Sequence, residues 1–335
     1  MKRYSVFDNP IKIFGLPEVY KENKLTRLPA ELIEKLPPAY EHFGRRCHGA
    51  RFAFKTNSQV FTIKAEYETL SCDAGMSIFA CQSFEVFSGE RAKSRYLGLV
   101  NPPDYNTKSF EKTFHKSRET EEITVFFPRN EIVKSIEIFI EDYAEISAPD
   151  EYKYRVPVVF YGSSITEGGH ANNVSVGYNA ILSRHLDFDY INLGFSGSAK
   201  GEREMAEYIS TLDMSTFVYD YDFNADSVEQ LRETHSAFFN IIREKHSNLP
   251  VIMMSRPKAE YTDEEKQRRE VIYSTYKTAK ASGDENVYFL DGEAFFGSDE
   301  DRHLCSTDGT HPNDLGFYRM SQVIEPVLKA ILENI

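Results

Sequence analysis

Residues 157–166 have the sequence Pro-Val-Val-Phe-Tyr-Gly-Ser-Ser-Ile-Thr. The apolar run Val158–Tyr161 has the length of a buried strand, and the glycine after it permits a tight turn. Pro157 stands just ahead of the run, where the start of a strand tolerates a missing N–H. The stretch therefore predicts a buried strand that ends in a turn, with Ser163 and Ser164 just beyond the strand.

Four more short apolar runs follow, and amphipathic helical stretches separate them. These runs are Tyr190–Leu193, Phe217–Tyr219, Val251–Met254 and Val287–Leu290. This alternation is typical of a parallel sheet that helices cover on both faces. Two helices have capping-box spacing at their starts, at Asp226 with Glu229 and at Thr262 with Glu265. The last helix should follow Pro312, and Pro326 should kink or split it.

The first half of the chain has a different pattern. From about residue 52 to residue 140, apolar and polar residues alternate with period two, for example at Phe61, Ile63, Ala65 and Tyr67. Several short strands of this kind, separated by turn-forming residues, predict an antiparallel β-sandwich. One helix is expected in this half, near residues 30–36. The change of pattern at residues 148–150 predicts two domains, a sandwich over 1–150 and an α/β domain over 151–335.

Composition limits the classes of function. A length of 335 residues fits two domains, and 41% hydrophobic residues indicate ordinary folded cores. The formal net charge of -13 disfavours binding to nucleic acid or to an anionic membrane. The N-terminus lacks the apolar core of a secretory signal, so a cytoplasmic location is expected, unless a signal has been removed. The four cysteines show no metal-binding spacing and are expected to be reduced thiols.

Candidate functional residues follow the ends of the predicted strands. Ser164 follows the first strand, Gly194 the second and Asn224 the third, while His311 lies in the loop beyond the fifth. In an open α/β sheet these positions meet at one edge. Asp308 lies three residues before His311. A serine nucleophile needs a base within hydrogen-bond reach and a carboxylate that orients the base, so the set predicts acyl-transfer chemistry.

Each of these residues also has a purely structural interpretation. Ser163 and Ser164 could cap a helix, since serine is common at that position. Gly194 and Asn224 could be turn residues, and His311 could be a histidine of a surface loop. The convergence of all of them at one sheet edge favours the catalytic interpretation.

With these residues in view, the chain resembles the SGNH hydrolases, the GDSL-type esterase superfamily. The blocks of similarity are Gly162–Thr166, Gly194, Asn224 and Asp308–Pro312. The resemblance implies a three-layer α/β/α, flavodoxin-like fold. It also implies Ser164 as nucleophile, His311 as base and Asp308 as the partner of His311. The oxyanion donors would be the N–H groups of Ser164 and Gly194 and the side-chain amide of Asn224.

The match to this family has departures. Ser163 stands where the family usually has aspartate, although that aspartate is not the acid of the triad. Asp222 and Ala225 replace the glycine and aspartate that usually flank the position of Asn224. The stretch 49–58 resembles the start of a jelly-roll module found in carbohydrate esterases.

The resemblance implies an esterase that removes a short acyl group, foremost an acetyl group on a carbohydrate, without metal or cofactor. Its partner would be a small-molecule or carbohydrate acyl ester, and a homo-oligomer is compatible with a chain of this size. Two alternatives stay open. An acyltransferase would use the same triad with an acceptor hydroxyl in place of water. A glycan-binding protein would use the sandwich beside a degenerate catalytic domain.

Overall fold

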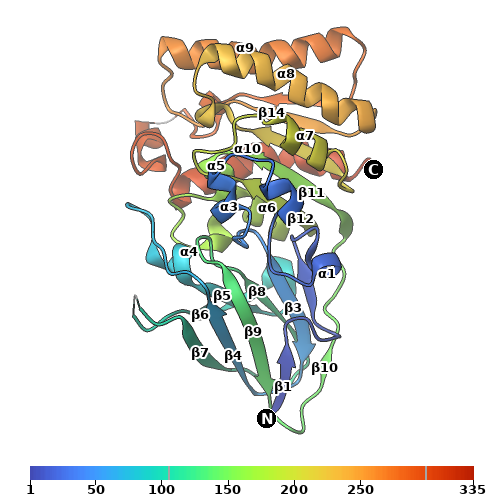
Figure 1. Ribbon diagram of the computed structural model, residues 1–335, viewed down its shortest axis with the longest axis vertical. Coiled ribbons are helices and arrows are strands. Elements are labelled where there is room, and N and C mark those ends of the chain that lie inside the picture. Colours follow the sequence, from blue (N-terminus) through green and yellow to red (C-terminus); the bar gives the residue numbers. More distant parts are fainter. Residues whose placement is uncertain (105, 299) are drawn as a thin grey trace.

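The computed structural model describes residues 1–104, 106–298 and 300–335. Figure 1 shows a β-sandwich that contains the N-terminus, and above it an α/β unit whose helices surround a further sheet. This arrangement confirms the predicted fold class, an antiparallel sandwich followed by a three-layer α/β/α unit. The functional argument depends on the junction between these two parts.

The sandwich consists of two antiparallel sheets. One sheet has the order β1-β9-β4-β7, with β1 (Lys2–Ser5), β9 (Val133–Ile140), β4 (Val60–Tyr67) and β7 (Ser109–His115). The other has the order β10-β3-β8-β5-β6, with β2 paired to β3. Its strands are β10 (Ile146–Ser147), β3 (Arg51–Thr56), β8 (Glu121–Phe126), β5 (Phe84–Ser88), β6 (Arg95–Val100) and β2 (Lys12–Phe14). The alternating residues Phe61, Ile63, Ala65 and Tyr67 of β4 are all buried in the core between the sheets, as their period predicts.

The third sheet is parallel, with the order β12-β11-β13-β14-β15. Its strands are β11 (Tyr154–Gly162), β12 (Phe188–Gly194), β13 (Thr216–Asp220), β14 (Val251–Met254) and β15 (Val287–Leu290), and every predicted run lies within one of them. Alternate residues of β11 enter different cores, Val159 and Tyr161 on one face and Val158 and Phe160 on the other. Burial on both faces explains why these strands are continuously apolar.

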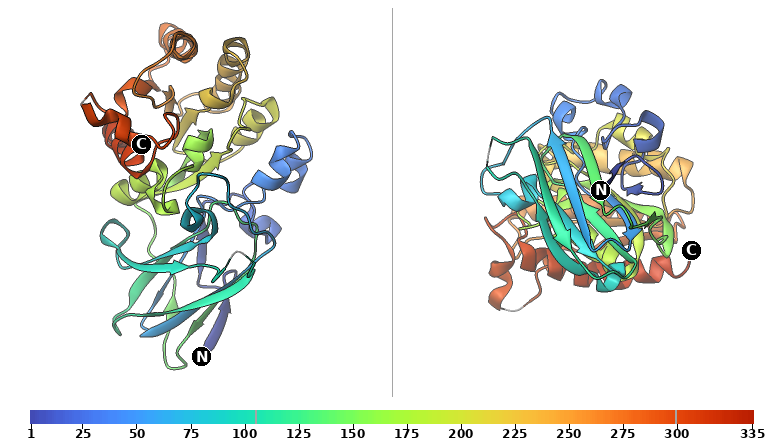
Figure 2. Two further views of the ribbon diagram at one scale, coloured as in Figure 1. Left: turned by 90° about the vertical axis from the view of Figure 1, so that its left-hand side faces the viewer. Right: turned by 90° about the horizontal axis from the view of Figure 1, so that it is seen from below.

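Helices cover both faces of this sheet. One face packs against α7 (Arg203–Ile209), α8 (Val228–Lys245) and α9 (Asp263–Ala281), and the other against α6 (Tyr178–Leu186) and α10 (Asp314–Leu332). Figure 2 shows α10, in red, across the sheet from α8, in gold. Shorter helices are α1 (Val19–Glu22), α2 (Ala30–Ile33), α3 (Ala39–Phe43), α4 (Ile78–Gln82) and α5 (Ser164–Glu167). Five 3-10 turns complete the described elements: η1 (Arg91–Lys93), η2 (Val174–Val176), η3 (Asp222–Asn224), η4 (Gly292–Ala294) and η5 (Glu300–Cys305).

Of the two predicted capping boxes, one is correct and one is wrong. Thr262 and Glu265 form the capping box at the start of α9. The predicted start at Asp226 is wrong, because the cap of α8 is Ser227, whose side chain accepts from the N–H of Gln230. Pro326 does not split α10, which continues on both sides of it.

The N-terminal segment also contributes to the core of the α/β unit. Leu28, Leu32 and Tyr40 are buried in the same cluster as Val159 and Ile191 of the parallel sheet. Core packing therefore crosses the sequence boundary at residue 150, and the division into 1–150 and 151–335 stays a prediction. Among the helices of the described residues, none is long and apolar enough to cross a membrane.

Candidate functional site

The turn after β11 is built around a glycine and a capping serine. Gly162 lies in register with Gly194 of β12 and Asp220 of β13, and a Cβ atom on Gly162 would come within 1.9 Å of the carbonyl oxygen of Asp220. Only glycine permits this close approach. Ser163 then caps α5, its Oγ accepting from the N–H of Ile165 at 3.2 Å. The capping interpretation is therefore correct for Ser163, whereas Ser164 is the first residue of the helix.

The structure brings Ser164, His311 and Asp308 together in one chain of hydrogen bonds. The Oγ of Ser164 lies 2.9 Å from Nε2 of His311. On the other side of the ring, Nδ1 of His311 lies 2.7 Å from Oδ2 of Asp308. Because an ionised carboxylate only accepts, we assign the proton to Nδ1, which leaves Nε2 as the acceptor for the serine hydroxyl. A nucleophile, a base and an orienting acid require this order of contacts.

The loop that holds Asp308 and His311 is fixed by local hydrogen bonds. The other oxygen of Asp308 accepts the N–H of Thr310 at 2.9 Å and the N–H of His311 at 2.7 Å. Partial burial opposes ionisation of Asp308, but these contacts with His311 and Thr310 outweigh it and lower its pKa to about 2. Asp308 is therefore an anion at neutral pH. Asn313 then caps α10 and anchors the end of the loop, its N–H donating to the carbonyl of Cys305.

The structure contradicts the expected role of Gly194. Its N–H donates to Oδ1 of Asn192 at 2.8 Å, so this group is already used within the protein. A Cβ atom on Gly194 would come within 2.2 Å of the backbone nitrogen of Glu167. The glycine is therefore needed for close packing of β12 against α5, and its N–H is not available to a substrate.

The place of Asn224 agrees only in part with its expected role. It ends the turn η3 after β13, and its Nδ2 donates to the carbonyl of Phe195 at 2.9 Å. A side-chain amide has two N–H bonds, so one stays available. Asn224 thus joins the turn after β13 to the loop after β12.

Gly197, in the same loop, is not among the site residues expected from the sequence. This residue has φ +65°, which favours glycine, and a Cβ atom there would meet nothing within 4 Å. Within the described part of the chain, the N–H groups of Gly197 and Ser164 have no hydrogen-bond partner. The stretch 193–198 contains both Gly194 and Gly197. Nothing in its sequence shows that Gly194 is packed against α5 and that Gly197 faces open space.

Sequence profiles assign both halves of the chain. The profile of the GDSL-like lipase/acylhydrolase family matches residues 155–329, and the N-terminal profile of SGNH-hydrolase-type esterases matches residues 4–146. The chain belongs to the GDSL-like lipase/acylhydrolase family. This confirms the resemblance found in the sequence. No curated protein matches the chain.

Solved structures resemble this GDSL-like protein over nearly its whole length. A protein of Bacteroides ovatus described as a GDSL-like lipase is 26% identical with a TM-score of 0.88, and the match covers 99% of this chain and 98% of that one. A salicylyl-acyltransferase, SsfX3, from a tetracycline biosynthetic pathway is 18% identical with a TM-score of 0.83, over 98% and 97% of the two chains. A family two carbohydrate esterase of Clostridium thermocellum, solved with cellohexaose, is 14% identical with a TM-score of 0.62, over 86% and 94%.

A second histidine of this GDSL-like protein lies beside the hydrogen-bonded chain of Ser164, His311 and Asp308, and the sequence did not predict it. The rings of His170 and His311 have centroids 4.6 Å apart. His170 has φ +67°, and its N–H donates to the sulfur of Met76 at 3.1 Å. Burial and the neighbouring His311 lower the pKa of His170, so it is neutral at pH 7. Met76 brings the sandwich part of the chain to within contact of this site.

Within the described part of the chain, His170, Asp308 and His311 form a group of residue types that can bind a metal ion. Ligand atoms of His170, Asp308 and His311 lie within 4.8 Å of one another. Asp308 and His311 already bind each other through Oδ2 and Nδ1. A cation held by all three residues would compete with this hydrogen bond.

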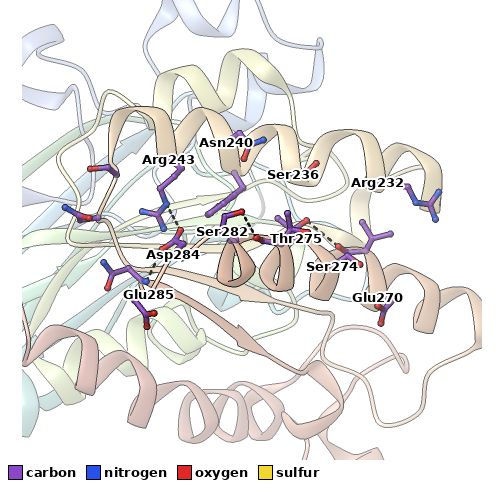
Figure 3. Close-up of a pocket in the computed structure, with 18 of the residues that line it drawn as sticks. Arg232, Ser236, Asn240, Arg243, Glu270, Ser274, Thr275, Ser282, Asp284 and Glu285 are labelled. Atoms are coloured by element: carbon purple, nitrogen blue, oxygen red, sulfur yellow. Dashed lines mark hydrogen bonds and ion pairs between the residues drawn. The ribbon is translucent and has the colours of Figure 1, made fainter.

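Two cavities differ in their relation to the triad. One of about 810 Å³ borders the loop of Asp308, lined by Ser306 and Gly309 together with Lys258, Phe296 and Arg302. The other, of about 1040 Å³, lies between α8 and α9 (Figure 3). Arg243 and Asp284 form an ion pair of 2.9 Å in its wall, and no residue of the triad lines it. The first cavity adjoins the loop of Asp308 through Gly309, although Ser164, Asp308 and His311 are not among the residues that line it.

Proposed function

We propose that this chain is a serine esterase that hydrolyses a short-chain acyl ester. The hydrogen-bonded chain Ser164–His311–Asp308 is the observation on which this proposal rests. The family is one of lipases and acylhydrolases, which agrees with ester hydrolysis.

The reaction follows from the geometry. Oγ of Ser164 attacks the ester carbonyl carbon while Nε2 of His311 accepts the hydroxyl proton. Asp308 stabilises the imidazolium that forms. The tetrahedral intermediate then collapses, the C–O bond to the alcohol breaks, and the alcohol leaves with the proton from His311. Water attacks the acyl-enzyme with His311 again as base, which releases the acid and restores Ser164.

The negative charge on the carbonyl oxygen needs hydrogen-bond donors. The N–H of Ser164 at the start of α5 is one candidate, and the second amide N–H of Asn224 is another. The unengaged N–H of Gly197, in the same loop as Gly194, is the third candidate. Preorganised donors of this kind stabilise the transition state, and loss of one typically costs about 10²–10³ in kcat.

The proposed substrate is an acetyl ester of a carbohydrate. The fold shared with a family two carbohydrate esterase supports this choice. The likeness to a salicylyl-acyltransferase over nearly the full length favours a second candidate, transfer of the acyl group to an acceptor hydroxyl. The same triad forms the acyl-enzyme in both cases. An intact triad disfavours the third alternative, a glycan-binding protein with a degenerate catalytic domain.

The test is release of p-nitrophenol from acetate and octanoate esters by the wild type and by Ser164→Ala. We expect turnover of the acetate ester, slower turnover of the octanoate ester, and no turnover above background in the variant. Adding candidate acceptor alcohols then separates the two candidates, because an esterase yields only free acid and a transferase yields a new ester. Activity that survives in Ser164→Ala would contradict the proposal.

A further inference from the structure

A buried cluster of charges lies where the sandwich meets the α/β unit. Glu167, in the same short helix as Ser164, has no exposed side-chain surface and lies between two arginines from the N-terminal half of the chain. Its Oε2 is 3.2 Å from Nη2 of Arg129, and its Oε1 is 3.7 Å from Nη2 of Arg27. Burial alone would raise the pKa of Glu167, but the charges of Arg129 and Arg27 outweigh it and lower the pKa to about 2. Glu167 is therefore a buried anion that depends on its partners.

Ser196, in the loop after β12, is held by two members of this cluster. Nη2 of Arg129 donates to Oγ of Ser196 at 2.8 Å. Both the N–H and the hydroxyl of Ser196 donate to Oε2 of Glu167, the N–H at 3.0 Å. The backbone and the side chain of Ser196 are thus both fixed by groups outside its own loop. The next residue is Gly197, whose N–H is unengaged within the described residues.

Arg129 also reaches back into the sandwich part of the chain. Its Nη1 donates to Asp73 at 3.0 Å and to Oδ1 of Asn130 at 2.8 Å. The guanidinium therefore joins a loop of the sandwich to Ser196 and Glu167. Its planar fork allows these simultaneous contacts, which an ammonium group cannot reproduce.

From this arrangement we infer that Arg129 is a positioning residue for the acyl-transfer reaction: from the sandwich it holds Glu167 and Ser196, and so fixes the backbone N–H groups that bind the oxyanion. The inference rests on the proposed function. It makes the sandwich part of the catalytic machinery without any contact between Arg129 and the substrate. Displacement of the loop would weaken binding of the transition state more than binding of the ester.

The test compares two buried arginines that both cross the junction. Arg51 of β3 has no exposed surface either, and it pairs with Asp189 and donates to the carbonyl of Tyr190 at 3.0 Å. These partners lie at the start of β12, at the opposite end from Gly194. Arg51→Lys is therefore a matched control for Arg129→Lys, since each variant keeps the positive charge and loses the several N–H donors of a buried guanidinium group. Lysine is preferred to alanine because an uncompensated Glu167 would risk unfolding.

The measurements are kcat and KM for p-nitrophenyl acetate and hydrogen exchange of the segment 195–199. For Arg129→Lys we expect kcat to fall by about 10–100-fold with KM within about threefold, less than loss of a whole oxyanion donor. Exchange in 195–199 should become faster in this variant. Arg51→Lys should keep kcat within about twofold and leave hydrogen exchange in 195–199 unchanged. This should hold even if its melting temperature falls as much as that of Arg129→Lys.

An unchanged kcat in Arg129→Lys, or equal losses of kcat in the two variants, would overturn the inference. Failure of the proposed function can be distinguished from failure of this inference. If wild-type turnover does not depend on Ser164, both the function and the inference fall. If turnover depends on Ser164 but not on Arg129, only the positioning role falls.

Discussion

At the scale of single residues, the proposed catalytic role of His311 depends on its proton. Asp308 keeps Nδ1 protonated by accepting from it at 2.7 Å, and this leaves Nε2 free to accept from Ser164. An asparagine that presents its amide to Nδ1 would favour the opposite tautomer and remove the acceptor.

We therefore expect Asp308→Asn to lower kcat for p-nitrophenyl acetate by up to about 10⁴-fold. Asp263→Asn is the control, because Asp263 is an exposed carboxylate at the start of α9 and pairs with Lys266 at 3.4 Å. Steady-state kinetics of the two variants decide the matter. A loss of less than about threefold in Asp308→Asn would remove Asp308 from the proposed triad.

Glu167 gives a prediction for pH. Its pKa in the folded chain, about 2, is below the value of about 4.3 expected in an unfolded chain. A lowered pKa in the fold means that the carboxylate stabilises the protein fully above the unfolded value. This contribution is lost as pH falls from there through the folded pKa.

The free energy of unfolding of the wild type should therefore exceed that of Glu167→Gln at pH 7, and the difference should shrink as the pH falls below about 4. Denaturant unfolding at a series of pH values measures this difference. A difference that is constant from pH 7 to pH 3 would show that Glu167 is not a buried, paired anion.

Residue types and order in the sequence were enough to predict which residues meet at the sheet edge. Ser164, Asp308 and His311 lie together as their positions after the strands indicate. The free backbone N–H groups were harder to predict, because tertiary hydrogen bonds decide whether an N–H group can donate to a substrate. The N–H of Gly194 is taken by Asn192, and nothing in the stretch 193–198 signals it. Arg129 and Glu167 are distant in sequence and belong to no motif, so their pairing required the structure.

At the scale of elements, the ends of helices follow local side-chain chemistry. The spacing of Thr262 and Glu265 predicted the start of α9 correctly, since both halves of that capping box form. The same spacing at Asp226 and Glu229 failed by one residue. Ser227 takes the capping position of α8, while Asp226 pairs with Lys200 and its N–H donates to Gln230.

Ser227→Ala should accordingly lower the free energy of unfolding by about 1 kcal/mol, whereas Asp226→Ala should change it by less than about 0.5 kcal/mol. Urea unfolding of the two neighbouring variants makes a direct comparison. Equal losses, or a larger loss in Asp226→Ala, would contradict the assignment of the cap.

At the scale of the whole molecule, the two parts of the chain are joined by a buried core and by buried arginine contacts as well as by the connecting segment. The N-terminal residues Leu28, Leu32 and Tyr40 are buried against Val159 and Ile191 of the parallel sheet, and Arg51 and Arg129 cross the same junction. The sequence pattern predicted both architectures from their periodicity. It did not predict this junction, because a short segment such as α2 has too few residues to signal its partner.

A fragment of residues 151–335 would expose the apolar surface that the N-terminal segment covers, and it would leave Glu167 without Arg129 and Arg27. We expect this fragment to be much less stable than the full chain and to lack esterase activity. Circular dichroism during heating and p-nitrophenyl acetate turnover test this expectation. A fragment that unfolds cooperatively at the temperature of the full chain and keeps its kcat would mean that the junction contributes to neither stability nor catalysis.

The most direct test of the central claim, that Ser164 is an activated nucleophile, is covalent labelling with a fluorophosphonate. A serine activated in this way attacks the phosphorus, displaces fluoride and keeps the phosphonyl group, and peptide mass spectrometry then locates the adduct. We predict one adduct per chain, on Ser164, that is absent in Ser164→Ala and forms far more slowly in His311→Ala. An unlabelled wild-type chain, or an adduct on any other residue that persists in Ser164→Ala, would contradict the account.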